Sequence, residues 1–201
     1  MPTYQTTKLL LELEEQNQQL LAAVRKWKKT PPEILTFRPA TDKWNAIECL
    51  DHLNSYGKYY LPAIEKAVST TPGDKRILPS TFSPGWLGNY FTNLMLPDNQ
   101  GKVKKMKAPK AHLPHSCLNA PAVMAEFEQQ LLQFSALLKK AAKTDLNKAR
   151  VPVSIMPLIK LKLGDVLRFV IAHNQRHVLQ GENAIVSGGN MVPAARHQVM
   201  V

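Results

Sequence analysis

Apolar residues recur at helical spacing in four long stretches of this chain, and this periodicity restricts the possible folds more than any other feature. A pair of prolines, Pro31 and Pro32, stops the first stretch, and Ser187-Gly188-Gly189 stops the last. The predicted helices cover residues 3–30, 46–68, 120–143 and 163–186.

The segment between the second and third predicted helices is long and irregular. Residues 70–118 hold six prolines and four glycines, and only a short helix around residues 86–94 is expected. A connection of this length suits a crossover from one end of a helical bundle to the other. The loop around Pro152 and Pro157 leaves room for a short extended piece.

These elements predict an all-α fold, a four-helix bundle with a long crossover between helices 2 and 3. The crossover allows helices 1 and 2, or helices 2 and 3, to lie parallel, and either order departs from a simple up-down-up-down bundle. One domain over residues 1–187 accounts for all four helices, and a flexible C-terminal tail over residues 188–201 follows.

The net charge of +11 raises the question of nucleic-acid binding. Much of the charge lies at residues 25–29, where cations favour the end of a helix, and in a basic loop at residues 101–110, whose role the sequence leaves open. The basic loop holds no aromatic residue between its cations, and we find no zinc-finger, RNA-recognition or helix-turn-helix motif. Charge alone therefore does not favour a nucleic-acid partner. The cations concerned are Arg25, Lys26, Lys28, Lys29, Lys102, Lys104, Lys105, Lys107 and Lys110.

The location predicted from the sequence is the cytoplasm. No apolar run approaches the roughly 20 residues that span a bilayer, so no membrane partner is expected. The N-terminus lacks the pattern of a secretory signal. The two cysteines, Cys49 and Cys117, are too few for a disulfide framework and fit a reducing compartment.

The second helix begins with a specific signal. Asn45 followed three residues later by Glu48 has the form of a capping box, in which each residue bonds the backbone N–H of the other. This start places His52 about two turns into the helix.

His173 and His177 lie four residues apart on the fourth predicted helix, so both rings project from one face. This face continues through apolar residues and is expected to point into the bundle. Two imidazoles in a core are costly unless each has a partner, and one metal ion satisfies both. The alternative is one core histidine bonded to a backbone carbonyl and another at the rim.

His52 is the third histidine on a predicted helix, and metal sites in bundles are built from facing helices. Three imidazoles leave coordination positions open, as in catalytic sites. A rival constellation of His112, His115 and Cys117 lacks a fourth ligand and lies in a proline-containing loop. His197 lies in the tail and is expected to be inert.

Two motifs then resemble a known family. WNAIECLDHL at residues 44–53 resembles the Trp-Ser-x-x-Glu-x-x-x-His-Leu opening of the second helix in the DinB-like (damage-inducible) superfamily. LRFVIAHNQRHVLQ at residues 167–180 resembles its fourth-helix pattern His-x-x-Arg-His-x-x-Gln. Asn45 stands where the family often has Ser, and both residues cap helices.

The resemblance implies an up-up-down-down bundle, in which the first two helices run parallel and then the last two. It implies a divalent metal ion, nickel or zinc, held by His52, His173 and His177. It also implies a possible homodimer. Several relatives are thiol-dependent transferases or isomerases, and others are described as hydrolases.

Further residues are candidates for roles at this site. Glu48 is expected either to orient the nearby ligand ring or only to cap the helix. Gln180 could bond a water or substrate, or a neighbouring polar group. Arg176 could bind an anionic substrate or pair with a carboxylate. Tyr56 and Tyr59 could line the mouth of a cavity or belong to the core.

Three functions remain open for a small-molecule substrate. The first is a thiol-dependent S-transferase acting with a low-molecular-weight thiol, which is reactive as the thiolate. The second is a metal-dependent hydrolase. The third is a non-catalytic metal-binding stress-response module. The shortage of inward carboxylates other than Glu48 favours the thiol route.

Overall fold

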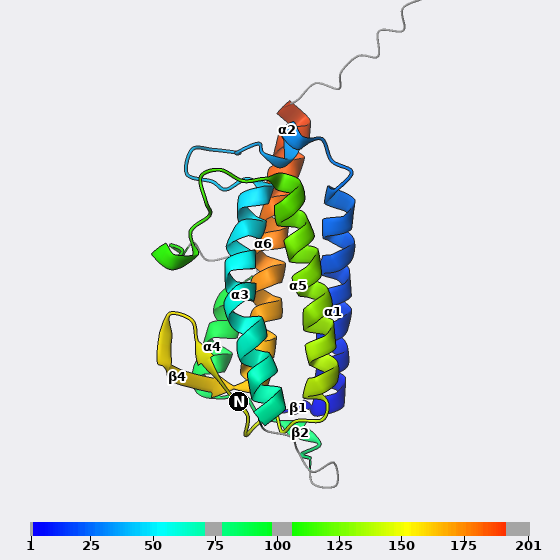
Figure 1. The fold of residues 1–201 in the computed structure, drawn as a ribbon, viewed down its shortest axis with the longest axis vertical. Coiled ribbons are helices and arrows are strands. Elements are labelled where there is room, and N and C mark those ends of the chain that lie inside the picture. The colour runs from blue at the N-terminus through cyan, green and yellow to red at the C-terminus, as the bar shows by residue number, and fades with distance from the viewer. Residues whose placement is uncertain (1, 71–77, 98–105, 192–201) are drawn as a thin grey trace, which may run out of the picture.

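The computed structural model describes residues 2–70, 78–97 and 106–191. Four long helices pack side by side and carry most of the described residues (Figure 1). The expectation of a mostly helical chain is confirmed. The long helices are α1 (Thr6–Trp27), α3 (Ala46–Thr70), α5 (Ala120–Ala141) and α6 (Leu163–Met191).

Shorter elements connect the four long helices. The helices α2 (Pro32–Leu35) and α4 (Trp86–Met95) and the 3-10 turn η1 (Lys110–His112) lie in the connections. Two small antiparallel sheets pair β1 (Tyr4–Gln5) with β2 (Thr81–Phe82), and β3 (Arg150–Val153) with β4 (Met156–Lys162).

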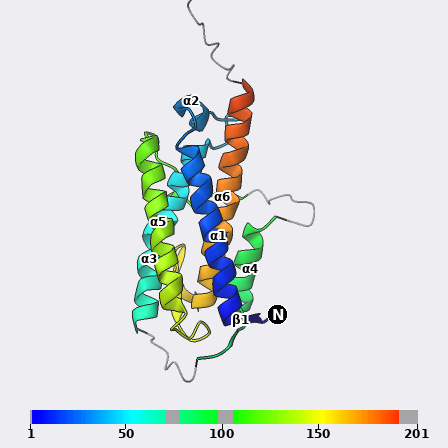
Figure 2. The same ribbon diagram turned by 90° about the vertical axis from the view of Figure 1, so that its right-hand side faces the viewer.

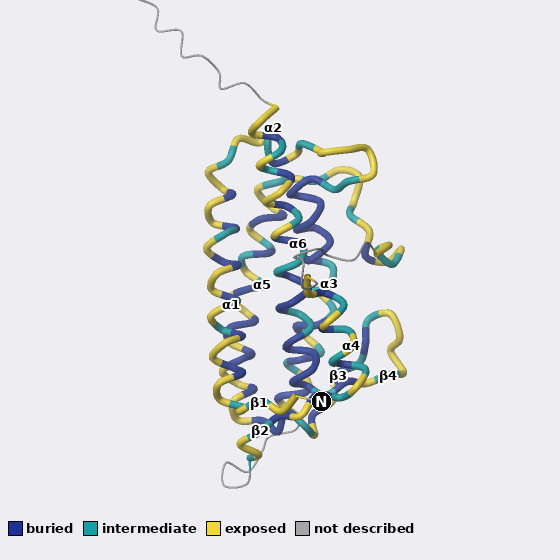
Figure 3. The backbone as a smooth tube through the Cα atoms, turned by 180° about the vertical axis from the view of Figure 1, so that it is seen from behind, coloured by how far each residue is buried: buried dark blue, intermediate teal, exposed yellow. Residues whose placement is uncertain are grey.

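The apolar stripes of the four long helices face one another and form the core, as the dark side of each helix in Figure 3 shows. Each stripe follows the helical period found in the sequence. Its fully buried members include Val24, Leu50, Ile64, Phe127, Leu131, Phe134, Leu167 and Ile171.

The up-up-down-down order that the family resemblance implies is wrong, whereas the other order that the crossover allows, with helices 2 and 3 parallel, is the one observed. Lys58 pairs with Glu126 and Glu65 with Lys140, so α3 and α5 run parallel. Figures 1 and 2 show α1 and α6 running the opposite way. The connection from α1 to α3 is short and stays at one end of the molecule, so these two helices are antiparallel. The long crossover returns the chain to that end before α5 begins.

The ends of the first and last helices also differ from the expected boundaries. Tyr4 pairs with Phe82 in a short sheet, so α1 begins only at Thr6. The last helix does not stop at Gly188, because this glycine lies against Phe37: an added Cβ would be 3.0 Å from the Phe37 Cβ. The helix continues to Met191, and the rest of the expected tail, 192–201, lies outside the described residues.

The loop after α5 forms a complete hairpin rather than a short extended piece. Arg150 pairs with Lys162 and Val151 with Leu161, and the register shifts after Pro152. The hairpin packs Val151 and Leu161 into the core beside the start of α6.

Part of the positive charge has a structural role. Arg25 and Lys28 at the end of α1 both pair with Glu128 of α5, which joins these antiparallel helices. Lys102, Lys104 and Lys105 of the basic loop lie outside the described residues. None of the described helices has the length and apolar character that a bilayer-spanning helix needs.

The contact between α1 and α6 depends on Gly181. A Cβ at this position would lie 2.4 Å from the Trp27 ring, which is 3% exposed. We expect Gly181→Ala to lower the free energy of unfolding by about 1–3 kcal/mol, because the buried ring or the helix must shift. Urea denaturation measures this change.

Gly189→Ala on the same helix is the matched control, because nothing lies within 4 Å of its added Cβ. Alanine is the better helix former, so this variant should be neutral or slightly stabilised. Equal effects of the two substitutions would contradict the close contact between Trp27 and Gly181.

Candidate metal centre

The beginning of α3 is fixed by the predicted capping box. The Asn45 side-chain oxygen accepts from the Glu48 N–H at 2.9 Å, and a Glu48 carboxylate oxygen accepts from the Asn45 N–H at 2.9 Å. The other Glu48 oxygen pairs with Arg38. Because Asn45 and Glu48 both make their capping bonds, the helix begins at a fixed residue, and the direction in which His52 projects is fixed as well.

Antiparallel packing of α3 on α6 brings His52 beside His173 and His177. The Nε2 atoms of His52 and His173 are 3.2 Å apart. The His177 ring lies 4.5 Å from the His52 ring and 4.8 Å from the His173 ring, between centroids. One nitrogen from each of the three rings lies within 4.8 Å of the others. The sequence-predicted ligands therefore converge on one point.

Burial keeps the three rings neutral at physiological pH. The residues His52, His173 and His177 are 2%, 5% and 9% exposed. Desolvation lowers the pKa of His52 to about 4 and that of His177 to about 3. The pKa of His173 falls well below its usual value, through burial first and then through the neighbouring histidines. Neutral imidazole is the form that binds metal ions.

The outer nitrogens of two rings have acceptors that orient them. His52 Nδ1 lies 2.6 Å from the backbone carbonyl of His112, and His177 Nδ1 lies 3.0 Å from the side-chain oxygen of Gln180. When both Nδ1 atoms donate to these oxygens, each Nε2 carries a lone pair. These lone pairs are directed away from the acceptors and are available to a ligand.

The spacing of one pair of nitrogens, from His52 and His173, fits a tetrahedral ion. Two imidazole nitrogens each about 2.0–2.1 Å from a zinc ion lie about 3.3–3.4 Å apart at the tetrahedral angle. The observed separation of the His52 and His173 Nε2 atoms is 3.2 Å. Without an ion this contact is an N–H···N hydrogen bond, in which the His173 Nε2–H donates when the His52 proton lies on Nδ1, and a divalent ion would take the place of that proton.

Aromatic rings surround the three histidines. The ring of Trp44 lies 4.9 Å from that of His52, and the ring of Phe169 stacks on that of His173 at 5.5 Å. Tyr56 meets His173 edge-on at 4.5 Å. A cavity of about 20 Å³ beside His173 has room for about one water molecule, so it is not a pocket for an organic substrate.

One comparison with known proteins identifies the family of the chain. A profile of the DinB superfamily matches residues 12–180, which include α3, the crossover and the histidine pair of α6. The chain belongs to the DinB superfamily. Comparison with curated proteins and with solved structures gives no match.

Other candidate residues of this DinB protein take different roles. Glu48 caps α3 and pairs with Arg38, while the acceptor for the His52 ring is the His112 carbonyl. Gln180 bonds its neighbour His177. Arg176 is partly buried and donates to the Leu94 carbonyl at 3.3 Å, and its charge contributes to lowering the pKa of His173.

The rival loop constellation is not brought together as a metal site. The ring of His112 contacts Ser55, that of His115 contacts Asp51, and Cys117 is exposed. Of the residues that the structure describes, only His52, His173 and His177 form a group suited to an ion. His197 lies outside those residues, and Tyr59 packs on Tyr60 rather than on the histidines.

The contact of the crossover with His52 does not follow from the sequence pattern. The His112 carbonyl is a backbone group, so no side-chain pattern could reveal it. Phe169, by contrast, precedes His173 by one helical turn, so the sequence places it on the histidine face, and its ring stacks on that of His173.

The metal-free DinB protein should lose stability as the pH falls from 7 to 5. Unfolded histidine has a pKa near 6.5, whereas folded His52 and His177 titrate at about 4 and 3, so the unfolded chain binds more protons in this range. The loss from His52 alone is about 2 kcal/mol at pH 5. Urea denaturation of the metal-free protein at both pH values measures it.

A His52→Asn variant is the control for this titration, because it removes one of the buried imidazoles. Its stability should fall less steeply between pH 7 and 5. A wild-type unfolding free energy that is the same at both pH values would show that the rings are not buried as neutral groups.

Proposed function

We propose that this DinB protein is a metal-dependent enzyme that holds a divalent ion, nickel or zinc, through His52, His173 and His177. The observation that carries the proposal is the convergence of three buried, neutral imidazoles with nitrogens within 4.8 Å of one another. Histidine nitrogens suit several divalent metals, so the donor set does not distinguish nickel from zinc.

The charge of the site favours an anionic co-ligand. All three proposed protein ligands are neutral, and Arg176 is near enough to lower the pKa of His173 and His177. The nearby carboxylates are already engaged, Glu48 by Arg38 and Asp51 by His115. An anion such as a thiolate would therefore complete a buried site that otherwise holds excess positive charge.

A low-molecular-weight thiol fits this charge pattern, and we propose an S-transfer reaction to an electrophilic small molecule. A bound divalent ion would stabilise the thiolate or, in the alternative function of a hydrolase, acidify a water molecule. The His112 carbonyl and the Gln180 side chain would orient the rings of His52 and His177. The aromatic side chains around the site would exclude water. The site offers no unengaged carboxylate as a general base for hydrolysis among the residues described above.

We also propose that the protein works in the cytoplasm. The free thiols of Cys49, which is buried, and Cys117, which is exposed, support a reducing compartment. A homodimer is proposed on the family resemblance, and light scattering of the purified protein tests it.

Metal content tests the site itself. We expect about one divalent ion per chain in the wild-type protein and a loss of nearly all of it in His173→Ala, because two imidazoles bind far less tightly than three. Elemental analysis of both proteins, purified in parallel, measures the content. His197→Ala, which removes a histidine outside the two motifs, should keep the wild-type amount. Equal metal in wild type and His173→Ala would refute the site.

Turnover separates the possible reactions. Zinc- and nickel-loaded protein is assayed for conjugation of glutathione to 1-chloro-2,4-dinitrobenzene and, without thiol, for hydrolysis of 4-nitrophenyl acetate. We expect conjugation that His173→Ala and chelation abolish. Ester hydrolysis alone would favour the hydrolase, and bound metal with neither activity would favour the non-catalytic module.

A further inference from the structure

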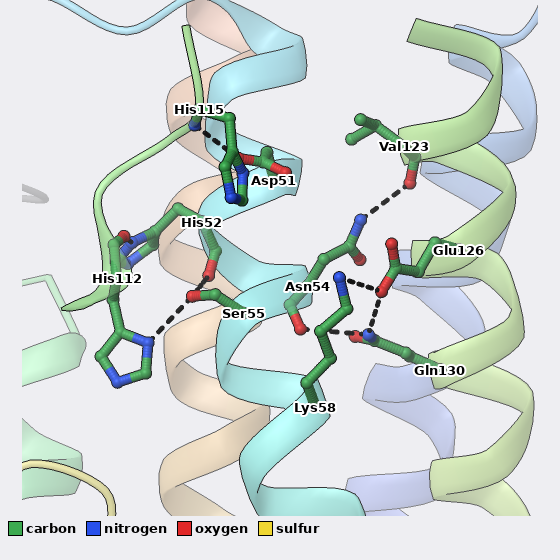
Figure 4. A network of polar contacts seen from close by, with 10 residues as sticks. All are labelled: Asp51, His52, Asn54, Ser55, Lys58, His112, His115, Val123, Glu126 and Gln130. Carbon is green, nitrogen blue, oxygen red and sulfur yellow. Dashed lines mark hydrogen bonds and ion pairs between the residues drawn. The ribbon is translucent and has the colours of Figure 1, made fainter. Parts of the chain in front are cut away.

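The crossover passes over the histidine centre along one side of α3. We define the crossover strap as residues 109–116, which include η1 and run beside the first turns of α3 (Figure 4). The strap is contacted by four α3 residues: Asp51, His52, Ser55 and Tyr56.

The central contact is between the strap and a proposed metal ligand. The His112 carbonyl lies 2.6 Å from Nδ1 of His52, which is 2% exposed. A carbonyl oxygen only accepts, so this contact keeps the proton on Nδ1. The lone pair is thereby placed on Nε2, the atom that faces His173 at 3.2 Å.

The side chain of His112 is held by the helix as well. Its Nδ1 lies 2.9 Å from Ser55 Oγ, and the Ser55 hydroxyl also contacts the His52 carbonyl at 2.7 Å. With one hydroxyl proton, Ser55 donates to that carbonyl and accepts from His112 Nδ1–H. The His112 ring also stacks on Tyr56, with centroids 3.9 Å apart.

A second anchor lies three residues further along the strap. One carboxylate oxygen of Asp51 accepts from the backbone N–H of His115 and from its ring Nδ1, both at 2.9 Å. Asp51 is 8% exposed whereas the His115 side chain is 73% exposed, so the bond to the His115 backbone N–H is the better shielded half of this anchor.

We propose that the crossover strap is a positioning element of the histidine centre: Asp51 and Ser55 hold the His112 carbonyl against His52, which fixes the tautomer of that ring and so retains the ion. The retention of metal rests on the function proposed above. His112 acts through its backbone and is a positioning residue. Acceptors of this kind for metal-bound histidine are worth about 10–100-fold in metal affinity.

The opposite side of α3 provides a matched control. There Glu126 of α5 contacts Lys58 at 2.9 Å and Gln130 at 3.2 Å, and none of these residues contacts the three histidines (Figure 4). Glu126→Ala removes a carboxylate and two polar contacts beside the same helix, as Asp51→Ala does.

The first measurement needs no metal. Long-range ¹H–¹⁵N spectra of the metal-free protein at pH 7.5 report which nitrogen of His52 carries the proton. We expect the Nδ1–H tautomer in the wild type and in Glu126→Ala. The Asp51→Ala/Ser55→Ala double variant should show both tautomers in exchange, since the His112 carbonyl is no longer held. If the double variant does not fold, the same spectra of Ser55→Ala alone report the tautomer.

The second measurement is zinc affinity by competition with a chelator. We expect binding about 10–100-fold weaker in the double variant and unchanged in Glu126→Ala. An unchanged Nδ1–H tautomer in the variants overturns the inference, whatever the affinity does. If the wild-type protein binds no zinc or nickel, the proposed function is refuted. The tautomer of His52 is measured without metal, so it still tests whether the crossover strap positions that ring.

Discussion

The site of this DinB protein depends on the removal of three imidazoles from water. In water each ring would be hydrated and partly protonated near neutral pH; between α3 and α6 the rings are held neutral, with pKa values of about 4 for His52 and 3 for His177. Desolvation is costly, and bonds to the outer nitrogens of His52 and His177 offset part of it. The ring nitrogens that point into the site lie within 4.8 Å of one another, and this arrangement favours the binding of a cation.

Each part of the fold around this point constrains the next. The capping box at Asn45 and Glu48 sets where α3 begins, and hence the direction in which His52 projects. The antiparallel contact with α6 brings that ring opposite the pair at His173 and His177. The crossover, which must return the chain to the start of α5, passes beside the same turn of α3 and supplies an acceptor. The long connection is therefore part of the site as well as of the topology.

The local features were predictable because each depends on residues close in sequence. The capping box needs a spacing of three and the histidine pair a spacing of four, so both follow from helix geometry. The direction of the helices was not predictable, because an apolar stripe is the same whichever way its helix runs. Gly188 was misread as a stop, since its contact with Phe37 joins residues about 150 positions apart. The His112 carbonyl leaves no trace in side-chain patterns at all.

The ligand set and its surroundings together restrict the chemistry. Glu48 pairs with Arg38 and Asp51 with His115, so neither of these described carboxylates is left to balance the charge of the proposed ion at the three histidines. Arg176 adds to this excess from the α6 side, as the lowered pKa values of His173 and His177 indicate. Aromatic walls from Trp44, Tyr56 and Phe169 limit the entry of water that could screen it. An anion whose charge is concentrated on one soft atom would gain most at such a site, and for this reason we propose a thiolate rather than a neutral substrate.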